Sequence, residues 1–107
     1  MIQFKVEKEE KYVLVYFEME GGIITPNHLK SLSPPDPITQ NFAHLGVILS
    51  GRGPVWLYGF LVHYYHPTKW VATYDPRLQG AVVVESHTPE VQVGDIIPLE
   101  NPTNATT

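Results

Sequence analysis

Residues 44–54 read HLGVILSGRGP, and this stretch decides the fold that we expect. The segment His44–Leu49 ends in three branched apolar side chains and is typical of a buried strand. The SGRGP that follows combines two glycines with Pro54, which suits the start of a helix. A buried strand that runs directly into a glycine-rich turn and a helix indicates an α/β unit.

The pattern on both sides of this stretch predicts one α/β domain with a mixed sheet and two helices. Upstream we expect strands over 2–6 and 12–17, a short helix over 25–32 that Thr25 caps, and a proline-rich loop over 33–37. Downstream we expect a helix from Pro54 to about Tyr65 and three more strands, over 69–74, 81–84 and 96–99. The domain should span residues 1–100, and we expect the polar tail 101–107 to be disordered.

Composition narrows the class of protein. A chain of 107 residues that is 43% apolar can bury one hydrophobic core but not two. It contains no cysteine, which excludes disulfide bonds and thiolate chemistry. The beginning of the chain has no hydrophobic signal segment, and no apolar run is long enough to span a membrane. We therefore expect a soluble cytoplasmic protein that does not bind a membrane.

The charge balance restricts the partners. Lysine and arginine total 7 against 11 for aspartate and glutamate, so the formal net charge is −4. A protein that coats long nucleic acid usually presents a basic face, and this composition argues against one. A short anionic ligand held in a locally positive site remains compatible with this charge.

The first candidate site is the loop made of Ser50, Gly51, Arg52 and Gly53. Glycines let the backbone approach a ligand closely, and the free amides at the start of a helix attract phosphate. Arg52 can add a bidentate phosphate contact. The alternative is a tight turn between strand and helix with a solvated arginine.

Three further groups of residues carry ionisable side chains. His63 and His66 are three residues apart, so they share one face of the predicted helix and could both point at one metal or one phosphate. Asp75 and Arg77 follow a strand, and so does His87. The structural alternatives are packing of His63 in or beside the core, an interaction of His66 with the end of the helix, a rigid turn for the Asp75–Arg77 pair, and a structural role for His87.

Ser50, Asp75 and His87 each come directly after a predicted strand, where α/β sheets bind their ligands. A simple hairpin between the last two strands, however, would place Asp75 and His87 at opposite edges of the sheet. Either these strands do not pair as a simple antiparallel hairpin, or the site is shared between subunits. Both alternatives stay open at this point.

The order and spacing of several motifs resemble one family. The motifs are SGRGPVWL at 50–57, FLVH at 60–63, YDPRL at 74–78 and GAVVV at 80–84, followed by Ser86-His87. Together they resemble the Csx-three family of CRISPR-associated type III ring nucleases. Compared with the family pattern, Gln79 looks like an insertion that lengthens the turn after Arg77. Tyr58 stands where the family helix can carry a histidine.

The resemblance implies a fold, a ligand and an assembly. It implies a Rossmann-like fold, a homodimer, and a dimer of dimers that holds one cyclic tetra-adenylate. The implied activity is manganese-dependent linearisation of this second messenger, which switches off the type III CRISPR antiviral response. Two alternatives stay open: a sensor that binds the ring without cutting it, and a manganese-dependent exonuclease that removes adenylates from the 3′ end of short single-stranded RNA.

The resemblance also assigns roles to individual residues. His66, Asp75 and Arg77 fall on the family's catalytic positions. His87, together with Asp75 and His66, falls on the implied Mn²⁺ site. Ser50, Gly51, Arg52 and Gly53 fall on the loop that binds the ligand. Independent chemistry agrees with these roles, because imidazole and carboxylate suit manganese better than calcium, and imidazole transfers protons near neutral pH.

Overall fold

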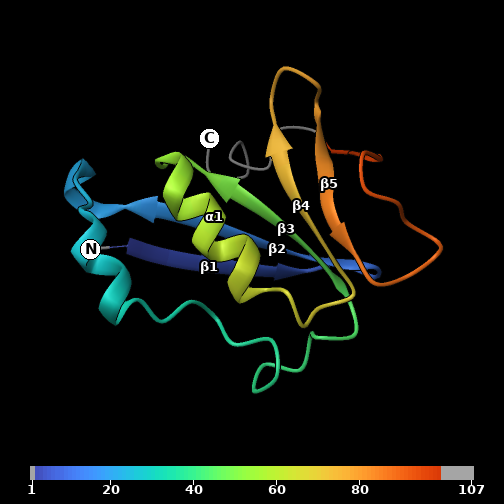
Figure 1. Ribbon diagram of the computed structural model, residues 1–107, viewed down its shortest axis with the longest axis horizontal. Helices are drawn as coiled ribbons and strands as arrows, with labels where there is room; N and C mark the ends of the chain where they lie inside the picture. The colour runs from blue at the N-terminus through green and yellow to red at the C-terminus, as the bar shows by residue number, and fades with distance from the viewer. Residues whose placement is uncertain (1, 100–107) are drawn as a thin grey trace.

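The structure is a computed structural model that describes residues 2–99. Six strands form one sheet, and their order in the sheet is their order along the chain (Figure 1). The strands are β1 (Ile2–Lys8), β2 (Tyr12–Met19), β3 (Gly46–Gly51), β4 (Trp70–Asp75), β5 (Gly80–Ser86) and β6 (Ile96–Pro98). All six strands predicted from the sequence are confirmed, although most of their ends move by one or two residues.

The sheet is mixed. Strands β2, β3 and β4 are parallel, whereas β1, β5 and β6 each pair in the antiparallel direction with the preceding or following strand. The three parallel strands therefore end at one edge of the sheet, which we call the carboxyl edge, and begin at the opposite amino edge. Strand β5 runs back from the carboxyl edge to the amino edge.

The pairing of β4 with β5 decides a question that the sequence left open. The two strands are antiparallel from Asp75 opposite Gly80 to Trp70 opposite Ser86, with one register shift next to Val71. The alternative in which they do not form an antiparallel hairpin is therefore wrong. Asp75 lies at the carboxyl edge, and His87, just after β5, lies at the amino edge.

A hydrophobic core lies on each face of the sheet, because successive strand residues point to opposite faces. On one face, strand residues pack against helix α1 (Val55–Tyr64), which crosses the sheet in Figure 1. The buried residues of this core include Val13, Val47, Leu49, Leu57 and Leu61. The core on the other face contains Leu14, Ile48, Trp70, Ala72, Ala81 and Val83.

The end of α1 holds the proline-rich loop in place. The hydroxyl of Tyr65 donates a hydrogen bond of 2.7 Å to the carbonyl of Pro35, and that of Tyr64 donates one of 3.1 Å to Pro34. Burial raises the pKa of the Tyr65 hydroxyl, so this group remains a donor at any physiological pH. The loop is thereby fixed against the end of α1.

The predicted α/β domain with two helices is confirmed, with one difference in helix type. The segment after Thr25 is a 3-10 helix, η2 (Pro26–Ser31), and none of its residues is buried. Only Leu29 of this segment packs against the core, and a short segment with so little apolar contact gains little from becoming an α-helix. Another short 3-10 helix, η1 (Glu20–Gly22), follows β2.

Two expectations remain predictions. The first is the Rossmann-like arrangement, with which the three parallel neighbours β2, β3 and β4 agree without establishing it. The second is the disorder of the polar tail. The polar tail 101–107 lies outside the described residues. Within the described part of the chain, no helix is long and apolar enough to cross a membrane.

Candidate functional site

The glycine-rich loop lies at the carboxyl edge and borders a cleft of about 760 Å³. Ser50, Gly51 and Arg52 line this cleft together with Tyr16, Tyr58 and Tyr74. Ser50 and Gly51 are the last residues of β3, so the ligand loop begins inside the strand rather than after it. Arg52 is exposed, with its guanidinium available to an anion in the cleft.

The backbone of this loop is fixed by contacts that only glycine permits. Gly51 has φ of 153°, and a Cβ there would lie 2.3 Å from the carbonyl oxygen of Phe17. The hydroxyl of Tyr58 donates a hydrogen bond of 2.5 Å to the carbonyl of Gly51. Tyr58 therefore has a local role here, because it holds the loop against the first turn of α1.

Asp75 and Arg77 form an ion pair at the same edge. Asp75 accepts a hydrogen bond of 2.9 Å from the backbone amide of Arg77, and its other oxygen lies 3.1 Å from the Arg77 guanidinium. These hydrogen bonds hold the pKa of the Asp75 carboxyl below its usual range. The side chain of Arg77 is 88% exposed, so it can also reach a bound phosphate.

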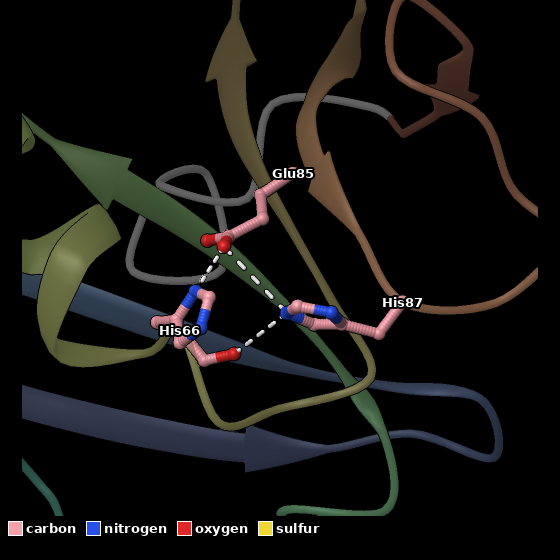
Figure 2. Close-up of side chains that lie close together, drawn as sticks. All are labelled: His66, Glu85 and His87. Atoms are coloured by element: carbon pink, nitrogen blue, oxygen red, sulfur yellow. Dashed lines mark hydrogen bonds and ion pairs between the residues drawn. The ribbon is translucent and has the colours of Figure 1, made fainter.

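A different cluster occupies the amino edge. His66 follows α1, whereas Glu85 and His87 come from the end of β5 (Figure 2). Nδ1 of His66 is hydrogen-bonded to Glu85. Nε2 of His87 lies 3.5 Å from the same carboxylate and 3.1 Å from the carbonyl oxygen of His66. The two rings meet edge to face, with centroids 4.8 Å apart.

This cluster has the composition of a metal site. One ligand atom from each of His66, Glu85 and His87 lies within 4.8 Å of the others. Two imidazole nitrogens and one carboxylate oxygen fit a divalent transition metal such as Mn²⁺ better than Ca²⁺, which prefers oxygen alone. The proton that Nδ1 of His66 shares with Glu85 must leave before that nitrogen can bind a metal.

The structure brings together only some of the predicted site residues. His66 lies with His87, and Asp75 lies with Arg77 near the ligand loop. The two groups are at opposite ends of β4, which at about 3.3 Å per residue separates them by about 17 Å. A site that contains His66, His87 and Asp75 together therefore requires two molecules. His63 is not part of the metal-capable cluster.

Sequence reasoning missed Glu85. Glu85 and His87 are two residues apart at the end of a strand, and side chains at that spacing point to the same face. The spacing was therefore a usable signal for a paired carboxylate and imidazole. Their meeting with His66 depends on how the chain turns after α1, which no local pattern encodes.

Comparison with known proteins identifies the family. The family model for CRISPR-associated proteins (Cas_csx3) matches residues 17–98. The chain belongs to this family. It is also similar to an uncharacterized protein of Aquifex aeolicus (strain VF5), at 48% identity over 101 residues that cover 94% of this chain and 90% of the relative. The Cas_csx3 match includes both edge clusters, and it confirms the family resemblance found in the motifs between Ser50 and His87.

Proposed function

We propose that this Cas_csx3 protein is a ring nuclease that binds cyclic tetra-adenylate and linearises it, which would switch off type III CRISPR signalling. The observation that carries the proposal is the division of the family's motif residues between two edges of one sheet. The carboxyl edge offers phosphate-binding groups, and the amino edge offers imidazoles with a carboxylate. Cleavage of a phosphodiester can use both, the first to bind phosphate and stabilise its charge and the second to transfer protons.

The carboxyl edge supports the binding half of this proposal. The exposed Arg52 and the loop amides offer positive charge and hydrogen-bond donors to phosphates in the cleft, and the exposed Arg77 follows Pro76, which lines the cleft. A guanidinium is suited to a phosphate because its donors match two oxygens at once. Arg77 would also stabilise the negative charge that grows on the phosphorane as the bond breaks.

The amino edge supports the proton-transfer half. The hydrogen bond from Nδ1 of His66 to Glu85 leaves Nε2 of His66 as the basic nitrogen. Glu85 thus orients the ring and would stabilise the imidazolium after it takes a proton. Glu85 and His87 could hold manganese while Nδ1 of His66 keeps its hydrogen bond, and the metal would neutralise a phosphate oxygen and make the nucleophile easier to deprotonate.

Because the two halves lie about 17 Å apart in one chain, we propose that they meet between molecules. The amino edge of one molecule would face the carboxyl edge of another, with the ring between them. A homodimer, and a dimer of dimers around one ligand, would supply symmetric copies of both edges to a four-fold symmetric ring. Asp75 and His66 of one reaction centre would then come from different dimers.

The test is incubation with cyclic tetra-adenylate, with and without Mn²⁺, analysed by liquid chromatography and mass spectrometry. We expect loss of the ring in the presence of Mn²⁺, and no loss with His66→Ala. Attack by the ligand's own 2′-hydroxyl gives a linear isomer of the same mass, which chromatography separates, whereas attack by water adds the mass of one water. The single-turnover rate per protomer should fall on dilution at limiting ligand.

The other outcomes of this experiment identify the alternatives. Binding without any product would indicate a sensor and would reject the ring nuclease. Faster shortening of linear oligoadenylate than of the ring would indicate a 3′ exonuclease. A cleavage rate that does not change on dilution would reject the shared site.

A further inference from the structure

A second hollow, of about 400 Å³, lies at the amino edge beside the metal-capable cluster. His66 and His87 form part of its wall, and His44 and Lys69 line the same hollow. Among the described residues that line it, Lys69 is the one lysine or arginine. The hollow therefore brings one ammonium group and three imidazoles together in a chain with a net charge of −4, with Glu85 beside them.

The backbone holds these side chains in a fixed relation. The amide of Lys69 donates a hydrogen bond of 3.1 Å to the carbonyl of Leu45, next to His44. The amide of His87 donates one of 3.0 Å to the carbonyl of Lys69. Three segments that are distant in sequence therefore meet at Lys69, which makes the hollow a built feature of the fold and not a chance gap between loops.

Lys69 already holds an anionic group in this structure. Its Nζ lies 3.2 Å from a carboxylate oxygen of Glu90, and both side chains are substantially exposed. An exposed ion pair of this kind contributes little to stability, so an incoming anion can replace the carboxylate at small cost. Glu90 does not line the hollow, so release of this ion pair would free Nζ of Lys69 for an anion held there.

We propose that Lys69 and His44 form a phosphate-binding subsite beside the His66–Glu85–His87 cluster, and that Glu90 pairs with the Lys69 ammonium when no phosphate is bound. This inference rests on the proposed function for the identity of the natural ligand, a phosphodiester of the cyclic oligoadenylate. The subsite would hold one phosphate group in the hollow that His66 and His87 line. Lys69 supplies charge, and a ring nitrogen of His44 supplies a donor.

The test uses inorganic phosphate as the probe, with metal-free protein at fixed pH and ionic strength. Phosphate is titrated while the ring resonances of the histidines are followed by NMR. We expect the signals of His44, His66 and His87 to shift in the natural protein. Lys69→Met should weaken the affinity for phosphate about ten-fold, as expected for a charge-assisted hydrogen bond, and Lys69→Arg should restore most of it.

Glu90→Gln is the matched control, because it breaks the same ion pair from the other side. If the subsite exists, the two variants differ: Lys69→Met loses affinity for phosphate, while Glu90→Gln keeps its affinity for phosphate or increases it. If Lys69 only tethers the 87–95 loop, both variants should change phosphate binding equally or not at all, and that result would overturn the proposal.

The same variants separate this inference from the proposed function. Phosphate binding that depends on Lys69, in a protein that neither binds nor cuts cyclic tetra-adenylate, would support the subsite and reject the proposed ligand. If the natural protein cleaves the ring but Lys69→Met does not change the affinity for phosphate, the proposed function is supported and the subsite is rejected.

Discussion

At the scale of single residues, the Asp75–Arg77 pair determines the charge present at the carboxyl edge. Asp75 accepts hydrogen bonds from the side chain and from the backbone of Arg77, and both favour the ionised carboxylate. Its pKa is therefore lowered, which means that Asp75 keeps its charge to a lower pH than an ordinary aspartate. The guanidinium that does this is exposed and remains able to contact a ligand.

We predict that Arg77→Ala raises the pKa of Asp75 toward its usual value, because the side-chain hydrogen bond is lost while the backbone one remains. The measurement is the pH titration of the Asp75 carboxyl carbon by NMR in both proteins. Identical midpoints would show that the pair does not form in solution. Lys69→Met, at the opposite edge, should leave the titration unchanged.

The metal-capable cluster at the amino edge leads to a second prediction at the scale of single residues. In dilute protein without ligand, Glu85→Gln should weaken Mn²⁺ binding by about ten-fold or more, since it removes the anionic donor that both imidazoles face. Asp75→Asn should leave Mn²⁺ binding unchanged, because Asp75 lies at the other edge. Electron paramagnetic resonance of free Mn²⁺ measures both. A loss of affinity in Asp75→Asn and not in Glu85→Gln would refute this assignment.

At the scale of elements, a glycine in β3 and a glycine in α1 have opposite effects on stability. Gly46 opens β3, and the indole of Trp70 packs directly over it, so that an added Cβ would lie 2.0 Å from a ring carbon. Gly59 lies on the exposed side of α1, and a Cβ there would meet nothing within 4 Å. The buried indole of Trp70 is a main part of the core on the face away from α1.

Gly46→Ala should therefore lower the free energy of unfolding by about 2–3 kcal/mol, since the ring must move within a packed core. Gly59→Ala should raise the free energy of unfolding by about 0.5–1 kcal/mol, because alanine is the better helix former. Urea denaturation of both variants, with equal slopes, measures these changes. Equal effects in the two variants would contradict the packing described for Trp70.

Element positions were well predicted from the sequence because they depend on local patterns. Alternation and apolar runs located all six strands, and Pro54 marked the start of α1. Gly51 was recognised as part of a ligand loop because its neighbours form a strand-to-helix turn. The pairing of Trp70 with Gly46 could not be predicted, since it depends on which strands become neighbours. The same is true of the contact between Glu85 and His66.

At the scale of the whole molecule, the direction of β5 is what separates the candidate site into two parts. His66 and Asp75 lie at opposite ends of β4, and the antiparallel pairing of β4 with β5, which the sequence left open, places His87 with His66. The sequence pattern alone had left a single site and a shared site equally open. A single chain carries the phosphate-binding groups at one edge and the imidazole cluster at the other.

The most direct test of this division is to mix two inactive variants. His66→Ala removes the imidazole at the amino edge, and Arg77→Ala removes the guanidinium at the carboxyl edge, so each alone should fail to cleave cyclic tetra-adenylate. Mixed in equal amounts, a His66→Ala molecule can present its intact carboxyl edge to the intact amino edge of an Arg77→Ala molecule. The account predicts that cleavage returns in the mixture. If both variants are inactive and bind the ring, and the mixture stays as inactive as its components, the two edges do not form one active site.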